Sequence, residues 1–404
     1  MTLLGSDAPY PRRTTLDALR ATPNALSVHY GRFEVAKRLL MTGHSHQAWP
    51  DVALQGQIEA FTDASAAVDA KWDLAFAKAE RLRQAYRDLL GDPGSAIALG
   101  ANTHELVVRF LSSLDLRARP RLVTTDGEFH TLRRQLARLA EEGIEVVRVA
   151  AAPADTLAER LAAEVDDRTA AVLVSAVLFE TARIVPGLDA VAAACEGRGA
   201  ELLVDAYHAL GVVPFSLRGI ESAWITGGGY KYLQLGEGNC FLRLPAHAQE
   251  LRPVVTGWFA EFEDLAAKAS GLVGYASGGD RFAGSTYDPT SHYRAAAVLD
   301  FFAAQELTPE FLRAVSLHQN GLLASLFDDL DADPAVITRD RSAPREAFGG
   351  FLALTAPNAG ELQKKLAERG VLTDSRGDKL RLGPAPYLSD SQLTAAIATL
   401  GEVL

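Results

Sequence analysis

Two short segments hold a carboxylate, an imidazole and an amine at positions from which they could serve one reaction. Asp205 ends the apolar run 202–204, and His208 follows it by three residues. Lys231 comes after a second apolar run, 223–226, and three consecutive glycines. In an open α/β sheet, ligands bind beyond the carboxyl ends of the strands. If both runs are strands, these side chains mark a candidate site.

These residue types suit the chemistry of pyridoxal phosphate. Its ring nitrogen must keep a proton, which a carboxylate such as Asp205 favours. Its aldehyde needs a partly desolvated amine, a role that Lys231 can fill. Its phosphate needs backbone N–H groups at the start of a helix together with hydroxyl groups. A third segment offers both, because an apolar run at 96–99 leads into Asn102 and Thr103.

Each of these residues also has an ordinary structural interpretation. An aspartate at the end of a strand often forms a turn or caps a helix. A lysine after glycines is often solvated, and three glycines can serve a tight turn or close packing alone. The combination of Asp205, His208 and Lys231 behind two neighbouring runs favours the cofactor interpretation.

Strands and helices must alternate to position these residues. Short apolar runs predict strands, and the segments between them carry apolar residues at helical spacing. The predicted strands are 96–99, 121–124, 146–149, 171–175, 202–204, 223–226 and 240–244, and the predicted helices are 106–114, 132–139, 157–165 and 188–194. The pattern indicates an α/β fold with a mainly parallel seven-stranded sheet and helices on both faces.

The pattern changes after Pro289 and predicts a smaller α+β unit. We expect helices at 291–305, 309–330, 360–369 and 389–404, with strands at 335–338, 350–355 and 379–382. A short helix is also expected at 14–20. We therefore divide the chain into an N-terminal arm that joins the small domain (1–48), a large cofactor-binding domain (49–289) and a small C-terminal domain (290–404).

Composition limits the classes of partner and compartment. The 404 residues are 48% hydrophobic and 23% charged, with a formal net charge of −11 and no basic stripe, so we expect neither nucleic acid nor a membrane surface as partner. The N-terminus lacks the apolar segment of a signal peptide, and no apolar run reaches the ~20 residues of a membrane span. Two cysteines, Cys195 and Cys240, allow no disulfide framework or CxxC zinc site. A cytoplasmic enzyme is expected.

The sequence resembles the class V branch of the fold-type I pyridoxal phosphate enzymes, and within it the kynureninases. The resemblance runs from about Gly43 to the C-terminus. It is carried by Asp-Ala-Tyr-His-Ala-Leu-Gly at 205–211 and by Gly-Tyr-Lys-Tyr-Leu-Gln-Leu-Gly-Glu-Gly at 229–238, with further matches at 257–259 and 381–387. It implies the fold-type I architecture, pyridoxal 5′-phosphate as cofactor, an amino-acid substrate and a homodimer with shared active sites.

The resemblance also implies roles for single residues around the cofactor. Lys231 would form the Schiff base, Asp205 would pair with the pyridine nitrogen, and His208 would approach the phenolic oxygen. Phe129 would stack on the ring, although core packing is its ordinary alternative. The implied phosphate contacts are Asn102, Thr103, Tyr230, Trp258 and, from the partner subunit, Thr286. Trp258 is equally interpretable as a core or interface aromatic residue.

For the substrate, Arg381 matches the arginine that clamps the α-carboxylate, and Arg376 competes with it for this role. Arg381 is preferred because it precedes the Gly-Pro-Ala-Pro stretch at 383–386. Tyr230 is a candidate proton donor by position. His44 and His46 could suggest a metal pair, but no matching cluster of ligands follows, so a structural or substrate-pocket role is expected and no metal site.

The resemblance implies a reaction through an external aldimine and a quinonoid, with kynureninase-like hydrolysis of the Cβ–Cγ bond that releases alanine. The sequence departs from kynureninases in two places, so the identity of the substrate's side chain stays open. An asparagine that kynureninases have is missing from 286–289, and the segment 43–50 differs from their usual form. A class V aminotransferase, a β-eliminating lyase and a hydrolase of another γ-keto amino acid remain alternatives. Cysteine desulfuration is disfavoured because no cysteine lies in the C-terminal domain.

Two interpretations from other classes are weaker. A nicotinamide-dependent oxidoreductase would share the α/β sheet, but the sequence has no Gly-x-Gly-x-x-Gly between a strand and a helix. A cofactor-binding regulator without catalytic activity would need a DNA-binding module, and neither spare length nor a basic helix is present.

Overall fold

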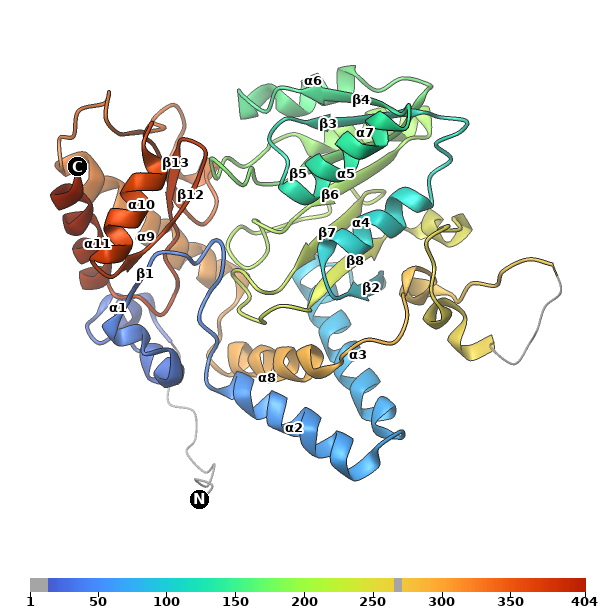
Figure 1. Cartoon of the computed structure of the whole chain (residues 1–404), viewed down its shortest axis with the longest axis horizontal. Helices are drawn as coiled ribbons and strands as arrows, with labels where there is room; N and C mark the ends of the chain where they lie inside the picture. Colours follow the sequence, from blue (N-terminus) through green and yellow to red (C-terminus); the bar gives the residue numbers. More distant parts are fainter. Residues whose placement is uncertain (1–13, 265–270) are drawn as a thin grey trace.

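The computed structural model describes residues 14–264 and 271–404, so residues 1–13 of the predicted N-terminal arm lie outside the described residues. A seven-stranded sheet forms the centre of the large domain (Figure 1). Its strands lie in the order β2-β8-β7-β6-β5-β3-β4, and only the two pairings made by β8 are antiparallel. The strands are β2 (Ala96–Gly100), β3 (Arg121–Thr125), β4 (Glu145–Val149), β5 (Thr169–Ser175), β6 (Glu201–Asp205), β7 (Trp224–Gly228) and β8 (Cys240–Leu244). The predicted mainly parallel seven-stranded sheet is confirmed.

Helices cover both faces of this sheet, as predicted. Successive residues of β5 alternate between the two apolar cores, with Leu173 on one side and Val172 and Val174 on the other. Leu106 and Leu132 join the first core, so α4 and α5 cover that face, and α6 and α7 pack on the opposite one. The bounds are α4 (Thr103–Ser112), α5 (His130–Glu141), α6 (Leu157–Ala163) and α7 (Leu188–Arg198).

Three further helices support the sheet from below in the view of Figure 1. They are α2 (Val52–Ala67), α3 (Lys71–Leu90) and α8 (Thr290–Ala304), of which α2 and α3 are not predicted from the sequence pattern. Helices α2 and α8 pack closely because Gly56 has no side chain: a Cβ atom there would lie 2.5 Å from the carbonyl oxygen of Tyr293. The hydroxyl of Tyr293 donates a hydrogen bond to Asp63 (2.9 Å).

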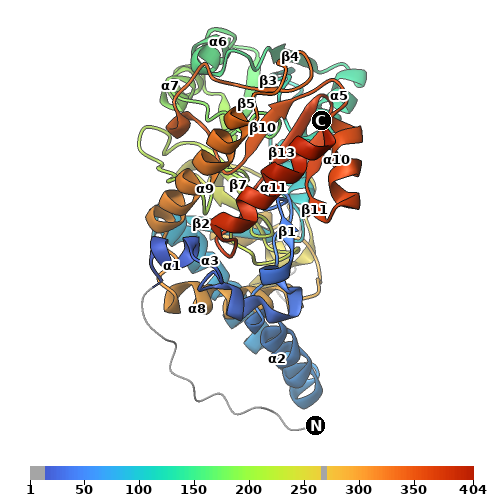
Figure 2. The same cartoon turned by 90° about the vertical axis from the view of Figure 1, so that its left-hand side faces the viewer.

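The rest of the C-terminal part forms the smaller α+β unit, which Figure 2 shows nearest the viewer. Its antiparallel sheet has the order β12-β13-β10-β9, and β1 from the N-terminal part pairs with β11 beside it. Helices and strands have these bounds: α1 (Leu16–Arg20), β1 (Leu39–Leu40), α9 (Pro309–Asp329), β9 (Thr338–Arg339), β10 (Leu352–Thr355), α10 (Ala359–Glu368), β11 (Val371–Leu372), β12 (Asp374–Arg376), β13 (Lys379–Leu382) and α11 (Asp390–Val403).

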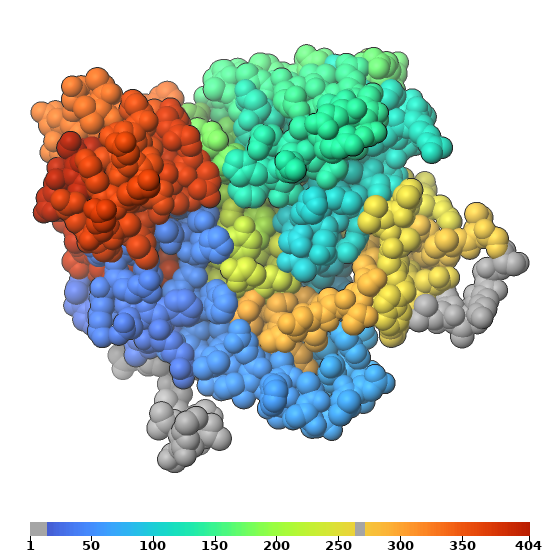
Figure 3. Space-filling model, viewed as in Figure 1, coloured from blue at the N-terminus to red at the C-terminus, as the bar shows by residue number. Residues whose placement is uncertain are grey.

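One strand prediction in this unit is wrong over most of its length. Residues 335–337 form no strand, because the side chain of Asp333 accepts a hydrogen bond from the N–H of Ala335 (2.9 Å) and holds a turn there. The space-filling view places the small domain, in orange and red, against the N-terminal residues in blue (Figure 3). Helix α8, which begins at the predicted limit of the small domain, packs with α2 and α3. The domain limits at 48 and 289 stay a prediction. Within 14–264 and 271–404, no helix combines the length and the apolar character needed to span a bilayer.

Candidate active site

A cavity of about 260 Å³ lies at the carboxyl ends of the parallel strands. Asp205 is the last residue of β6, and it pairs in register with Ser175, the last residue of β5. Lys231 follows β7 and is 6% exposed. Seven of the residues singled out in the sequence line this one cavity: Asn102, Thr103, Phe129, Asp205, His208, Tyr230 and Lys231.

The three glycines before Lys231 serve close packing. A Cβ atom on Gly228 would lie 2.3 Å from the hydroxyl oxygen of Tyr207, and one on Gly229 would lie 2.6 Å from a methyl carbon of Leu235. Neither glycine has a positive φ, so the demand is for space and not for a left-handed backbone. The chain after β7 can therefore fold tightly over Tyr207, which brings Lys231 into the protein.

The amine of Lys231 is held among aromatic rings and one imidazole. Its Nζ lies 2.6 Å from Nε2 of His208, 4.6 Å from the ring centre of Tyr207 and 5.5 Å from that of Phe129. Burial lowers the pKa of Lys231 to about 7, the charge of Asp205 opposes this shift, and the charge of Arg381 adds to it. The amine is therefore partly neutral at physiological pH, which a nucleophile or a base requires.

Asp205 and His208 both have unused hydrogen-bonding capacity. Within the described part of the chain, the N–H of Tyr207 (2.8 Å) is the one hydrogen-bond donor to the carboxylate of Asp205. Burial raises the pKa of this carboxyl, so a cation beside it would favour its charged form. Nδ1 of His208 is buried without a partner among the described residues, and burial lowers the pKa of this imidazole.

Arg381 lies behind the cavity wall and does not line the cavity. It is 3% exposed, and both its Nε (2.8 Å to Oδ1) and its Nη2 (to Oδ2) donate to Asp374. Its Nη1 donates to the carbonyl oxygen of Phe179, a residue that does line the cavity. Arg376 is more exposed, and its Nη2 lies 3.7 Å from Asp374.

His44 completes this buried cluster. Its Nε2 lies 2.8 Å from Oδ1 of Asp374, and its ring packs on Phe351 with 4.6 Å between ring centres. Burial opposes ionisation of Asp374, but His44 and Arg381 together hold the pKa of its carboxyl below the usual range. His44 thus has a structural role, as predicted, whereas His46 stacks on the ring of Tyr230 at 5.0 Å.

The other predicted residues lie at the margins of the site. The side chain of Asn102 caps α4 by accepting from the N–H of Glu105 (2.9 Å). Burial raises the pKa of Tyr230 to about 12, so its hydroxyl keeps its proton at neutral pH. Trp258 is 43% exposed, and neither it nor Thr286 lines the Lys231 cavity. Thr286 lies instead on a neighbouring cavity of about 1150 Å³.

Comparison with curated proteins finds kynureninases. The chain is 28% identical to the kynureninase of Deinococcus radiodurans, with 80% of this chain and 78% of that protein aligned. It is 26% identical to the kynureninase of Pseudomonas fluorescens (79% and 80%) and 28% identical to the isopenicillin N epimerase of Streptomyces clavuligerus (77% and 81%). No family model matches the sequence.

Solved structures agree on the fold. The cystine C-S lyase C-DES, in complex with cysteine persulfide, superposes with a TM-score of 0.78 at 19% identity over 91% of this chain and 98% of that one. A cysteine desulfurase from Thermococcus onnurineus gives 0.76 at 15% identity, covering 94% and 98%. The similarity in sequence and the shared fold together support a class V pyridoxal phosphate enzyme of fold-type I that is similar to the kynureninases.

The residues of this cavity fit pyridoxal phosphate. The cavity offers a buried amine, a carboxylate with open acceptor positions and an imidazole nitrogen without a partner. Lys231 would hold the aldehyde carbon, Asp205 the ring nitrogen, and the N-terminus of α4 with Thr103 the phosphate.

Three residues that support the site are not among those that the sequence pattern singles out: Ser175, Asp374 and Glu128. Ser175 could have been found as the polar end of a strand next to Asp205. Asp374 is the cross-strand neighbour of Arg381 in the hairpin of β12 and β13, which the Gly-Asp turn at 377–378 signals. Glu128 stands in Asp-Gly-Glu at 126–128, a sequence that looks like a solvated turn.

Glu128 is a buried carboxyl directly before Phe129. It accepts hydrogen bonds from the hydroxyls of Thr125 (2.7 Å) and Ser175 (2.6 Å) and from the N–H of Ser175 (3.2 Å). Burial raises its pKa to about 7 despite these bonds, and the charge of Asp205 adds to the shift. Glu128 thereby ties the segment that carries Phe129 to the end of β5.

This raised pKa makes stability depend on pH. The folded protein holds the Glu128 proton up to about pH 7, whereas the unfolded chain releases it near pH 4.5, so the contribution to stability is full below pH 4.5 and is lost as pH rises towards 7. Glu128→Gln removes this loss. In urea unfolding of cofactor-free protein, we expect its free energy of unfolding, relative to wild type, to rise by about 2 kcal/mol from pH 5 to pH 8.

The matched control is Glu159→Gln, which changes an exposed carboxyl on α6. Its stability relative to wild type should stay constant across the same pH range. A Glu128→Gln protein whose pH dependence equals that of wild type would contradict the assignment.

Proposed function

We propose that this chain uses pyridoxal 5′-phosphate at Lys231 to cleave the Cβ–Cγ bond of a kynurenine-like amino acid by hydrolysis, releasing alanine. One observation carries the proposal: the amine of Lys231 is buried, partly neutral and 2.6 Å from His208, in the cavity that Asp205 also lines. The similarity to two kynureninases supports the choice of reaction.

The bound cofactor supplies an aldehyde that links to amines and a ring that stores the negative charge left at Cα. In our proposal Lys231 would hold the cofactor by its aldehyde carbon. Its amine, when free, would remove and return a proton at Cα of the substrate, for which a pKa near 7 is suited. Asp205 would hold a proton at the ring nitrogen, and Phe129 would shield the site from water.

Arg381 is our candidate for binding the α-carboxylate of the substrate. A guanidinium has five N–H donors. Asp374 and the carbonyl of Phe179 occupy three of them, which leaves two for a carboxylate. The two bonds to Asp374 fix the plane of the guanidinium, so its remaining donors are oriented before a substrate binds.

A class V aminotransferase or a β-eliminating lyase is the alternative, because both also begin with proton removal at Cα. Similarity to an isopenicillin N epimerase points to the same first step. Persulfide transfer is disfavoured: Cys195 and Cys240 are both buried, and burial raises the pKa of each thiol, to about 12 for Cys195.

We further propose a cytoplasmic homodimer in which Thr286 of each chain serves the site of the other. Thr286 lines the cavity of about 1150 Å³, which adjoins the Lys231 cavity at Glu237 and Gly238. Exposed aromatic side chains, Trp258 and Phe262 (43% each), lie beside this cavity, as expected for a surface that a second copy covers.

Lys231→Ala tests the cofactor link. Wild-type protein loaded with pyridoxal phosphate should absorb visible light, and borohydride should abolish this absorption and fix the cofactor covalently. Lys231→Ala should bind no cofactor covalently, while Lys71→Ala, which changes a lysine outside the site, should behave as wild type. Covalent fixation by the Lys231→Ala protein, shown by mass spectrometry, would place the link elsewhere.

Arg381→Ala tests the carboxylate clamp. Loss of two charge-assisted hydrogen bonds should weaken amino-acid binding by about tenfold to a hundredfold while the absorption of the cofactor persists. Arg376→Ala is the matched control and should bind with nearly wild-type affinity in the same spectral titration. The opposite ranking of the two variants would move the clamp to Arg376.

Product analysis with kynurenine and 3-hydroxykynurenine tests the reaction. We expect alanine and an aromatic acid in equal amounts, because hydrolysis divides the substrate between Cβ and Cγ. Chromatography of the products distinguishes this from a keto acid with aminated cofactor, which indicates transamination, and from ammonia with pyruvate, which indicates elimination. Either of the latter outcomes, without alanine, would replace the hydrolytic proposal.

A further inference from the structure

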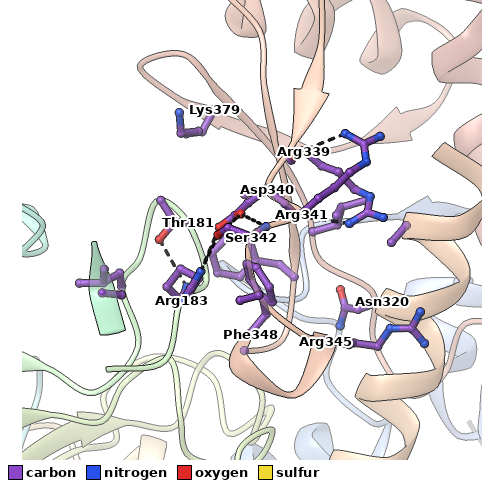
Figure 4. Close-up of a pocket in the computed structure, with 18 of the residues that line it drawn as sticks. Thr181, Arg183, Asn320, Arg339, Asp340, Arg341, Ser342, Arg345, Phe348 and Lys379 are labelled. Carbon is purple, nitrogen blue, oxygen red and sulfur yellow. Dashed lines mark hydrogen bonds and ion pairs between the residues drawn. The ribbon is translucent and has the colours of Figure 1, made fainter. Parts of the chain in front are cut away.

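A second cavity, of about 630 Å³, lies between the two domains and away from Lys231 (Figure 4). The large domain contributes residues 151–155 together with Leu178, Thr181 and Arg183, and the small domain contributes residues of α9, residues between 339 and 355, and Lys379. Ligand sites in proteins commonly have volumes of about 300–1,000 Å³, so this cavity has room for a small organic molecule.

Apolar and cationic groups both line the cavity. The apolar groups are small and hydrophobic side chains: Ala152, Pro153, Leu178, Phe348, Phe351 and Leu352. The cationic groups are Arg183, Arg339, Arg341, Arg345 and Lys379, beside the carboxylates of Asp155 and Asp340, and the guanidinium of Arg183 lies 5.2 Å from the ring centre of Phe348. This combination suits a ligand with an apolar body and an anionic head.

Ion pairs neutralise most of these cations. Figure 4 shows Arg183 turned towards Asp340 and Ser342, and Asp155 also binds this guanidinium (2.6 Å). Lys379 pairs with Asp378 at 2.9 Å. Arg339 and Arg341 share the single carboxylate of Asp328.

Arg345 is the exception. Its side chain has no hydrogen-bond or ion-pair partner within 14–264 and 271–404. Its guanidinium lies on the backbone of α9 at Gly321, where a Cβ atom would come within 1.8 Å of Nη1. The cavity therefore has five cations, and four carboxylates pair with them: Asp155, Asp328, Asp340 and Asp378. One positive charge is left over, which a monoanion would balance.

Two buried polar atoms of the cavity wall also lack partners in the described chain. They are Nε of Arg183, which is 7% exposed as a residue, and Oδ1 of Asn320. Figure 4 shows Asn320 beside Arg345. The first atom needs an acceptor and the second needs a donor, so a ligand that carries a carboxylate and an N–H or O–H group would satisfy both.

The cavity shares a wall with the active site. Leu178 lines it, whereas the next residue, Phe179, lines the Lys231 cavity and accepts from Arg381. Phe351 also lines it, and the ring of Phe351 packs on those of His44 (4.6 Å) and His208 (5.8 Å). A ligand here would contact both domains and Phe351, whose ring centre lies 5.5 Å from the guanidinium of Arg381.

We propose that this inter-domain cavity is a binding site for a small aromatic or aliphatic monocarboxylate that carries a hydrogen-bond donor, with its anionic head at Arg345. The site is separate from the cofactor site and does not depend on the reaction proposed above.

The test is a calorimetric titration of cofactor-loaded protein with salicylate, which has the required carboxylate and hydroxyl on an apolar ring. Arg345→Gln should weaken binding about tenfold or more, because it removes the unpaired charge. Arg369→Gln, which changes an exposed arginine of the same domain outside the cavity, should bind as wild type does. Salicylamide, the neutral match of salicylate, should bind wild type at least tenfold more weakly.

Two further variants separate the possible sites. Gly321→Ala keeps the charge of Arg345 but displaces its guanidinium from α9, so it should also weaken salicylate binding. Arg376→Ala should leave the affinity unchanged, because the cavity does not include Arg376. Equal affinity of wild type and Arg345→Gln, or loss of binding in Arg376→Ala, would overturn the proposal. Since the titration needs no turnover, its failure is distinguishable from failure of the proposed function.

Discussion

The removal of one lysine amine from water is the interaction on which the rest of the site depends. A charged amine buried among aromatic rings loses its hydration, and this loss lowers the pKa of Lys231 to about 7. Among the described residues, no carboxylate forms an ion pair with this amine. In the part of the chain that the structure describes, the hydrogen-bond partner of this amine is His208, which is itself poorly able to take a proton because burial lowers its pKa. The charge of Asp205 limits the shift, so the amine remains able to exchange a proton near neutrality.

The sheet provides the buried surroundings of Lys231, and the glycines before Lys231 allow the chain to direct this side chain into them. The carboxyl ends of β2, β3, β5, β6 and β7 meet at one edge, where their buried strands exclude water. Without side chains at Gly228 and Gly229, the segment after β7 can pass over Tyr207 and direct Lys231 inwards. The small domain also affects the pKa of Lys231. The positive charge of Arg381, which Asp374 holds in place, is one of the charges that lower this pKa.

The features that could be predicted are those that depend on residues close together in the sequence. The strands, the strand-end position of Asp205 and the burial of Lys231 follow from apolar runs and glycines a few residues apart. Glu128 could not be identified as buried, because its surroundings are supplied by Ser175 on another strand. The helices α2 and α3 were missed because their partner α8 lies some 200 residues later, and the turn at Asp333 replaced a strand through one side-chain hydrogen bond. The inter-domain cavity has no local signal at all, since five separate segments form it.

Residues other than Lys231 must determine which reaction follows proton removal at Cα. Kynureninases and an isopenicillin N epimerase are similar to this chain to nearly the same degree, so what they share with it cannot determine which bond breaks after Cα has lost its proton. The sequence departs from kynureninases at 43–50 and 286–289. In the structure, His46 stacks on Tyr230 and lies 3.8 Å from Glu237, and residues 286–288 line the neighbouring cavity. Tyr230 keeps its proton at neutral pH and lines the Lys231 cavity, so in our proposal it would donate a proton to Cβ when the Cβ–Cγ bond breaks. The proposed specificity for a kynurenine-like side chain therefore depends on the segments where the sequence departs from kynureninases.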